Sequence, residues 1–385
     1  MMDFDRTPDE NEFIDNVRDV MERRIKPRVK EWRKAKTTTR EFFRILGEEG
    51  LLGYRMKGDS IEMIPWSRNI YFYRELAEIS GGLAIAAFVH SQTGNKAIHS
   101  FGNEYHRDRY LIPGIGGEKI LGIANTEPGA GSDASAISLR AEDMGDHYLL
   151  NGSKSYITSG DIADAIVITA VTDPHAEKPH RGISMMVVDG DSPGLTRNRM
   201  DKIGWVESHL STLNLEDVEV PKENLIGAYN RGFYQTMEVF NSSRIGIAAT
   251  AMGSALGAFR MSFEYSNRRR IFGRTIFEHE SKRSEFADRI TTLQAAWLLI
   301  QKAAFRHDSG RDYSYNASMA KLFTTEEGSL VSHWAALNFG ARGILEGYPV
   351  SQYPLDSNAA LIGEGAPEVQ RKIISENIEA ILNDM

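Results

Sequence analysis

The spacing of apolar residues changes twice along this chain of 385 residues, and no other feature limits its fold as strongly. Between residues 12 and 32 apolar side chains recur every three or four positions, as on one face of an amphipathic helix. From about Lys119 short runs rich in Val, Ile, Tyr and Thr alternate with turn residues, as in strands. After Gly232 the helical spacing returns. The order helix, strand, helix predicts an α+β protein of several domains.

The two changes in spacing also predict where the domains meet. A chain of this length exceeds the roughly 250–300 residues that one core usually supports. We expect an N-terminal α-helical domain at 1–119, a small central β-barrel or sheet domain at 120–228, and a C-terminal four-helix bundle at 229–385. In the central domain, segments 148–150 and 156–158 flank Asn151 and Gly152, a pair that suits the tight turn of a hairpin.

Composition excludes several classes of function. The chain has no cysteine, which rules out disulfides, thiolate catalysis and zinc–thiolate sites. The ten histidines show no ligand spacing, so we expect no metal. A net charge of −8 argues against nucleic acid as the main partner. No run approaches the roughly 20 apolar residues of a membrane span, and residues 1–5 are acidic, so we expect a cytoplasmic protein without membrane contact.

One carboxylate near the C-terminus is a candidate general base. Glu364 stands between Gly363 and Gly365, and Pro367 follows at a place that suits the first position of a helix. Apolar neighbours would raise the pKa of Glu364 by desolvation, whereas the positive end of the following helix would lower it. A carboxylate poised to accept a proton is one interpretation. A surface glutamate at a helix start is the other.

A second stretch, at 124–133, has the composition of a ligand-binding loop. Its sequence is Ala-Asn-Thr-Glu-Pro-Gly-Ala-Gly-Ser-Asp. Glycines let backbone N–H groups approach a ligand closely, and Thr126 and Ser132 add hydroxyl donors. A tight β turn without a ligand is the alternative.

Together with two further motifs, these stretches resemble the acyl-CoA dehydrogenase family of flavoproteins over nearly the whole chain. The family's Thr-Glu-Pro-x-Ala-Gly-Ser-Asp loop is matched at 126–133, and its aromatic-Ile-Thr segment at 156–158. Its Arg-x-x-Phe-Gly run is matched at 269–273 and its Glu-Gly turn at 364–365. The resemblance implies that Glu364 is the catalytic base and that FAD is the cofactor.

The resemblance also implies roles for single residues. Thr126 and Thr158 would hydrogen-bond the flavin ring, Arg269 and Phe272 would reach the FAD of a neighbouring subunit, and Arg244 would hold the acyl-CoA. The full set implied to bind the cofactor is Ile123, Asn125, Thr126, Gly131, Ser132, Tyr156, Ile157, Thr158, Arg269, Phe272, Phe339, Gly340, Ala366 and Glu368. The set implied to bind substrate is Ser132, Asn241, Arg244, Gly363 and Gly365.

Three departures from the family pattern surround these motifs. Gly363 replaces a common tyrosine, Ala366 replaces a hydroxyl residue, and Tyr156 stands where tryptophan is usual. Loss of a tyrosine beside the base predicts a wider pocket for branched or cyclic acyl groups, unless Tyr156, His90 or Tyr353 fills the space.

The resemblance implies an FAD-dependent acyl-CoA dehydrogenase that forms a trans α,β double bond. We expect a homotetramer that passes electrons to an electron-transferring flavoprotein. Two alternatives stay open. One is an acyl-CoA oxidase or flavin monooxygenase of the same fold, and the other is a flavin- or acyl-CoA-binding protein that does not dehydrogenate.

Overall fold

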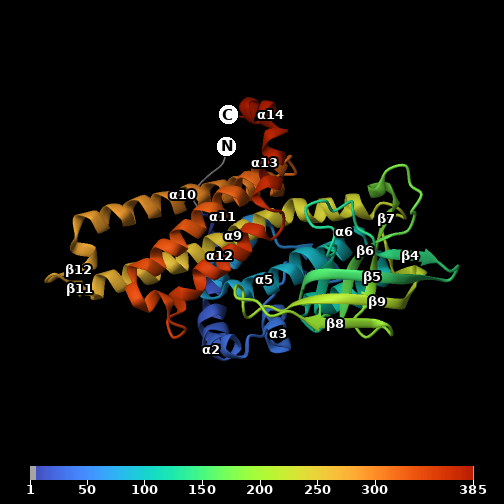
Figure 1. Cartoon of the computed structure of the whole chain (residues 1–385), viewed down its shortest axis with the longest axis horizontal. Coiled ribbons are helices and arrows are strands. Elements are labelled where there is room, and N and C mark those ends of the chain that lie inside the picture. Colours follow the sequence, from blue (N-terminus) through green and yellow to red (C-terminus); the bar gives the residue numbers. More distant parts are fainter. Residues whose placement is uncertain (1–5, 385) are drawn as a thin grey trace.

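The computed structural model describes residues 6–384. The acidic residues 1–5, on which the expectation of a cytoplasmic location partly rests, lie outside this range. The protein is elongated, with a β sheet at one end and long helices extending to the other (Figure 1). Helix α9 (Gly232–Arg268) runs from the sheet to the small hairpin β11–β12 (Arg270–Ile271 and Arg274–Thr275) at the opposite end. Within residues 6–384 no helix is both long enough and apolar enough to cross a membrane.

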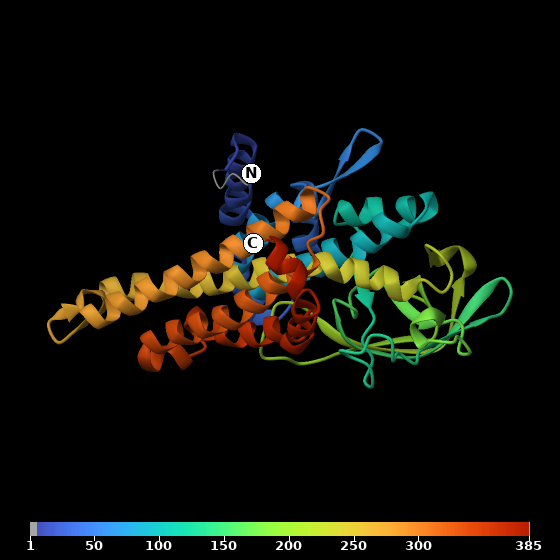
Figure 2. The same ribbon diagram turned by 90° about the horizontal axis from the view of Figure 1, so that it is seen from above.

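The N-terminal part is mainly helical, as predicted. Its first helix begins at a capping box in which Thr7 and Glu10 satisfy each other's backbone N–H groups. A hairpin of β1 (Tyr54–Lys57) and β2 (Ser60–Met63), which the sequence did not predict, projects from the body (Figure 2). The helices are α1 (Pro8–Val20), α2 (Lys26–Ala35), α3 (Arg40–Glu48), α4 (Trp66–Ile79), α5 (Gly81–Val89), α6 (Lys96–Phe101), α7 (Glu104–His106) and α8 (Ile112–Ile115).

The central part is one eight-stranded sheet with the spatial order β10-β7-β6-β4-β5-β9-β8 and with β3 paired to β6. Strand β3 lies parallel to β6, and its last residues lead into the loop at 125–133. The strands are β3 (Leu121–Ala124), β4 (Arg140–Asp143), β5 (His147–Thr158), β6 (Ala165–Val171), β7 (Ile183–Asp189), β8 (Leu195–Arg199), β9 (Leu210–Pro221) and β10 (Leu225–Ile226).

The predicted hairpin turn at Asn151 and Gly152 is wrong. Both residues lie inside the single long strand β5, which pairs with β9 on either side of them. The register shifts there, and Gly152 has a φ of 141°, so the pair forms a bulge. The turn that enters β5 lies at Gly145, because Met144 N–H donates to the carbonyl of His147. The Asn-Gly pair therefore indicated the positive φ of Gly152 correctly, but this residue lies in a bulge within a strand and not in a hairpin turn.

The C-terminal part is a helical bundle, as predicted. Small residues let its helices approach closely: a Cβ on Gly253 of α9 would lie 2.2 Å from the carbonyl oxygen of Arg74 in α4. Gly310 has a φ of 65° just past α10, as expected of a glycine that ends a helix. Besides α9 the helices are α10 (Glu280–Asp308), α11 (Ser314–Asn338), α12 (Gln352–Ile362), α13 (Pro367–Ser375) and α14 (Ile378–Asp384).

Candidate active site

Glu364 lies on a short turn between α12 and α13. Pro367 occupies the first turn of α13, as the sequence predicts, and Ala366 is its N-cap residue. Glu364 has a φ of 55° and Gly365 a φ of 97°. A left-handed backbone at a non-glycine residue costs on the order of 1 kcal/mol or more, so such residues persist only where their surroundings hold them.

Two buried side chains hold this turn. Lys321 of α11 donates from Nζ to the carbonyl oxygens of Leu361 at 2.7 Å and Gly365 at 2.8 Å. Gln370 of α13 donates from Nε2 to the carbonyl oxygens of Gly365 at 3.0 Å and Glu364 at 3.3 Å. Both residues are fully buried. Because backbone carbonyls are the acceptors on both sides, the position of the turn does not depend on the charge of Glu364.

The carboxylate of Glu364 contacts α9. Its Oε2 lies 2.5 Å from Oγ of Ser243, and the same hydroxyl lies 2.9 Å from the carbonyl oxygen of Phe240. Burial raises the pKa of Glu364 above its usual range, and the hydrogen bond from Ser243 and the charges of Arg244 and Lys321 oppose this rise. Burial in turn lowers the pKa of Lys321 to about 8. A carboxylate with a raised pKa is a stronger base, and it is suited to accept a proton from a weak carbon acid.

Arg244 directly follows Ser243 in α9, the residue that contacts Glu364. Its Nη1 donates to Oδ1 of Asn241 at 2.6 Å, and Oγ of Ser314 donates to the same oxygen at 3.0 Å. The side chain of Arg244 is nearly buried, and within residues 6–384 its Nε has no hydrogen-bond partner. A buried guanidinium donor without a partner is costly, so this N–H is available to a ligand.

The loop at 125–133 is fixed by a buried ion pair that the sequence analysis did not identify. Nζ of Lys154 in β5 lies 2.8 Å from Oε1 of Glu127 and 2.9 Å from the carbonyl oxygen of Asn125. Glu127 also accepts from the backbone N–H groups of Ser138 and Leu139. Oδ1 of Asn125 accepts from the hydroxyl of Thr169 in β6, so the side chain of Asn125 joins the loop to the sheet. The loop is therefore rigid at its base, whereas Gly131 and Ser132 at its tip are exposed.

Strand β5 bulges where it passes this loop. Tyr156 has a φ of 60°, and the β5–β9 register shifts between Lys154 and Ile157. The bulge leaves the Tyr156 side chain 61 % exposed. Bulges of this kind re-aim side chains next to functional sites. Ile157, by contrast, is buried in the sheet core, so only its backbone can meet a ligand.

The surface between the loop and the bulge fits a planar polar group such as a flavin ring. Thr126 and Thr158 are both half-buried, and in the described part of the chain neither hydroxyl makes a hydrogen bond. The two strands approach closely here, since a Cβ on Gly122 would lie 3.5 Å from the carbonyl oxygen of Thr158. Half-buried hydroxyls without partners are suited to ring heteroatoms. Ile123 is half-buried at the end of β3, beside this surface.

Four of the residues expected to bind the cofactor lie far from Glu364 within one chain. Arg269 follows Ser243 by 26 residues of α9, a separation of about 39 Å at 1.5 Å per residue. Phe272 is 96 % exposed at the tip of the β11–β12 hairpin. Phe339 is buried and stacks on Tyr265, so only its backbone and that of Gly340 can face a ligand. These residues cannot touch a ligand that also touches Glu364 of the same chain.

An indole ring lies beside Gly363, and the expectation of a wider pocket stays a prediction. The side chain nearest to a Cβ built on Gly363 is Trp205, whose ring atoms Cη2 and Cζ3 lie 3.5 and 3.7 Å away. Tyr353 instead donates to the carbonyl oxygen of Glu78, and His90 bonds the backbone of Gly114 and Leu121. Glu368 is exposed in the first turn of α13. No local pattern in the sequence pointed to Trp205 or Lys321, because each meets the turn from a distant segment. Gln370 was also missed, although it follows Gly365 by only five residues.

Comparisons with known proteins cover the whole of this architecture. Models of the N-terminal, middle and C-terminal domains of acyl-CoA dehydrogenase match residues 7–118, 122–218 and 230–379. A short-chain specific acyl-CoA dehydrogenase of Clostridium acetobutylicum is 32% identical over 98% of this chain and 100% of its own length. The caffeyl-CoA reductase-Etf complex subunit CarC of Acetobacterium woodii is 36% identical over 78% of this chain and 79% of its own.

Solved structures agree with the sequence relatives. Butyryl-CoA dehydrogenase from Megasphaera elsdenii superposes with a TM-score of 0.92 and 31% identity, over 98% of this chain and 100% of that one. The similarity therefore includes the order of the domains and the full length of the helical bundle.

Proposed function

Because the chain belongs to the acyl-CoA dehydrogenase family, whose members are flavin-dependent oxidoreductases acting on acyl-CoA, we propose that it removes hydrogen from Cα and Cβ of an acyl-CoA thioester to give the trans-2-enoyl-CoA. The observation that carries this proposal is the half-buried Glu364 carboxylate, held on a turn by buried side chains and with a raised pKa.

In this proposal Glu364 takes one proton from Cα, the electron pair of that C–H bond forms the new double bond, and a hydrogen of Cβ leaves as hydride. FAD, when bound, supplies the acceptor for that hydride, which no amino-acid side chain can accept. Negative charge develops on the thioester oxygen while the α-proton is removed, so donors near that oxygen stabilise the transition state. The backbone N–H of Glu364 is the donor that the turn itself offers.

Binding of the two ligands is assigned to opposite sides of this centre. Thr126, Thr158 and Tyr156 would hold the flavin ring, together with the exposed tip of the loop at 131–132. Arg244, with its free Nε, and Asn241 would hold the CoA part of the substrate. A mobile phosphate-rich ligand gains most from a guanidinium that is already fixed, and Asn241 fixes this one.

Assembly follows from the residues at the far end of α9. Arg269, Phe272 and Gly340 would act on the FAD of a neighbouring chain, in a homotetramer. Two facts support such a contact: Phe272 and Ile344 are almost fully exposed, and a hollow of about 1460 Å³ lies beside Gly340 and Gly343 and away from Glu364. Large apolar side chains that are exposed in one chain are typical of an interface.

The reverse reaction, reduction of an enoyl-CoA, is a second candidate. The contacts of Ser243 support it, because a hydroxyl has one proton and two neighbours here. Ser243 can donate to an ionised Glu364, or donate to Phe240 and accept from a protonated Glu364. The site can therefore hold the base or the acid. The name of the Acetobacterium relative, a reductase in a complex with Etf, is consistent with this direction and with an electron-transferring flavoprotein as partner.

The experiment that tests the function is anaerobic titration of the FAD-loaded protein with butyryl-CoA. We expect bleaching of the flavin and formation of crotonyl-CoA, and electrons should then pass to an electron-transferring flavoprotein. Rapid peroxide release in air would instead favour an oxidase. An unbleached flavin with every acyl-CoA, and no oxidation of reduced enzyme by crotonyl-CoA, would leave only a binding protein.

A further inference from the structure

Trp205, on the loop between β8 and β9, lies against the residue that precedes the base. A Cβ on Gly363 would point toward its indole ring, at 3.5 Å from Cη2. On the other side of the ring, a Cβ on Gly81 at the start of α5 would lie 3.0 Å from Cδ1 and Nε1. The indole therefore fits between two glycines that come from different parts of the chain. A Cβ on Gly81 would press on the ring, whereas a Cβ on Gly363 would only touch it, and a larger side chain there would meet it.

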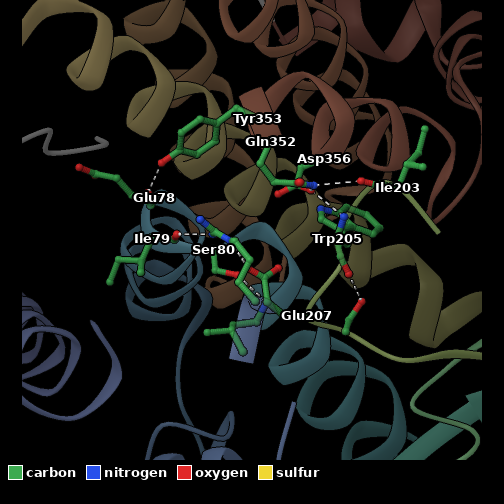
Figure 3. Close-up of polar contacts among 12 residues, drawn as sticks. Glu78, Ile79, Ser80, Ile203, Trp205, Glu207, Gln352, Tyr353 and Asp356 are labelled. Atoms are coloured by element: carbon green, nitrogen blue, oxygen red, sulfur yellow. Dashed lines mark hydrogen bonds and ion pairs between the residues drawn. The ribbon is translucent and has the colours of Figure 1, made fainter. Parts of the chain in front are cut away.

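The backbone of Trp205 is held as firmly as its ring. Its N–H donates to Oδ1 of Asp356 at 2.6 Å, and Nε2 of Gln352 donates to the same oxygen at 2.7 Å (Figure 3). Its carbonyl oxygen accepts from Nζ of Lys202 and from the N–H of Ser208. Trp205 adopts a φ of 51°, which a non-glycine residue keeps only in fixed surroundings.

Asp356 and Gln352 both belong to α12, the helix that ends at Gly363. A second contact joins the same two segments, because Nε2 of Gln352 also donates to the carbonyl oxygen of Ile203 at 3.0 Å. A Cβ on Gly204 would lie 2.4 Å from the carbonyl oxygen of Leu355, so the loop touches the helix backbone directly. The indole is thus fixed relative to the helix that carries the catalytic turn.

A neighbouring ion pair anchors the loop to the N-terminal part. Nε of Arg33 lies 2.6 Å from Oε1 of the fully buried Glu207, and Nη2 of Arg33 donates to the carbonyl oxygen of Ile79 (Figure 3). Glu207 follows Trp205 by two residues. The loop is therefore tied to α2, to the junction before α5 and to α12, which leaves the indole no freedom to swing aside when a ligand enters.

The two sides of Glu364 differ in character. On one side are the polar residues of α9, Ser243, Arg244 and Asn241, where the CoA part is expected. On the other side are Gly363, Trp205 and α5, whose residues Leu83, Ala84 and Ala87 are fully buried. In the proposed binding mode, an acyl chain whose Cα reaches Glu364 from the polar side would extend toward this apolar side.

We propose that Trp205 closes the acyl end of the site, in the place that a side chain at position 363 would otherwise take, and so limits the substrate to short acyl thioesters. This inference rests on the proposed function for the nature of the ligand, but not on the chemistry that follows binding. An indole that cannot move excludes each further methylene group of a longer chain, whereas removal of the ring opens a space that such a chain can fill.

The test measures binding, so that it does not depend on turnover. The FAD-loaded protein carries Glu364→Gln in every sample, and calorimetry compares the affinities for butyryl-CoA and octanoyl-CoA. Trp205→Ala should raise the affinity for octanoyl-CoA relative to butyryl-CoA by at least about tenfold. Ile203→Ala, an exposed residue of the same loop, is the matched control and should leave the ratio unchanged. Trp205→Phe should change the ratio in the same direction, and it serves if the alanine variant does not fold.

A pair of variants tests directly whether the indole of Trp205 and a side chain at position 363 compete for the same space. Gly363→Tyr should lower the affinity for both thioesters at least tenfold, because the new ring meets the indole. Adding Trp205→Gly to Gly363→Tyr should restore most of that loss, a non-additivity that general destabilisation does not produce. An unchanged octanoyl-to-butyryl ratio in both Trp205 variants, or a double variant no better than Gly363→Tyr, would overturn the proposal. If the ratio changes as expected but flavin in the Glu364 enzyme is never reduced, the proposed reaction fails and the role of Trp205 stands.

Discussion

Oγ of Ser243 lies 2.5 Å from Oε2 of Glu364, although the two residues are 121 positions apart in the chain. The contact joins the middle of the longest helix to the turn between two short ones. It also joins the two parts of the chemistry, because Ser243 adjoins Arg244, the expected anchor of CoA, and Glu364 is the expected base. The hydroxyl lowers the pKa of Glu364, while burial raises it.

Removal of that hydroxyl should move the pH profile of flavin reduction. Glu364 must be ionised to accept the α-proton, so the rate falls as the pH falls through its pKa. Ser243→Ala removes a contact that favours the ionised form, so this pKa rises further and the acid limb moves to higher pH. Stopped-flow reduction by butyryl-CoA between pH 5 and 9 measures the limb. A limb that moves to lower pH would show that Ser243 stabilises the protonated acid instead.

Lys321 should stabilise the turn mainly through its hydrogen bonds to backbone carbonyls and less through its positive charge. Lys321→Met keeps the length of the side chain but leaves the carbonyls of Leu361 and Gly365 without their donor, a loss of about 1–3 kcal/mol of unfolding free energy. We expect a lower urea midpoint together with slower flavin reduction. Lys30→Met, at an exposed position of α2, is the control. Equal urea midpoints for the two variants would mean that the hydrogen bonds of Lys321 do not stabilise the turn.

The buried pair of Lys154 and Glu127 should support the loop that meets the flavin. Lys154→Met leaves a buried carboxylate without its cation, which costs about 3–5 kcal/mol. Burial lowers the pKa of Lys154 to about 8, below that of a lysine in the unfolded chain, so the contribution of this group to the free energy of unfolding should rise as the pH rises above that value. The FAD content after gel filtration and the urea midpoint measure the two effects. Lys178→Met, which changes an exposed lysine, should alter neither.

Arg269 should couple FAD retention to assembly. Because Arg269 lies about 39 Å along α9 from Ser243, Arg269→Ala cannot disturb the flavin surface of its own chain. We expect weaker FAD retention together with loss of the tetramer, measured by absorbance and by light scattering. Arg268→Ala removes a neighbouring charge that pairs with Glu264 of the same helix, and it serves as the control. Full FAD occupancy in a monomeric Arg269 variant would contradict the proposed exchange between chains.

The sequence predicted local features of the site well and its distant contacts poorly. Pro367 and the glycines around Glu364 identify the turn that carries the proposed base, because a helix start and a positive-φ backbone each leave a local signature. The apolar spacing likewise predicted the succession of helices, strands and helices. Trp205, Lys321 and Glu127 left no such signature, since each acts on a segment that only the fold brings near.

One error and one unforeseen contact have physical explanations. The Asn151–Gly152 pair was predicted as a turn, but pairing with β9 over the length of β5 absorbed it as a bulge. The missing side chain at Gly363 predicts a wider pocket, and the unforeseen contact is an indole from a distant segment that lies beside this position. Comparing this sequence with the family pattern residue by residue reveals the missing tyrosine at Gly363. Only the packed structure reveals the indole of Trp205 beside it.

The exchange of Glu364 for glutamine tests the central claim most directly. Glu364→Gln keeps the shape of the side chain and removes its basicity, so the variant should retain FAD and bind butyryl-CoA. Its anaerobic flavin reduction should be slower than that of the wild type by roughly 10²–10⁴-fold, the contribution of a positioned base. Reduction at nearly the wild-type rate would show that another group removes the α-proton, and the account of this site would then be wrong.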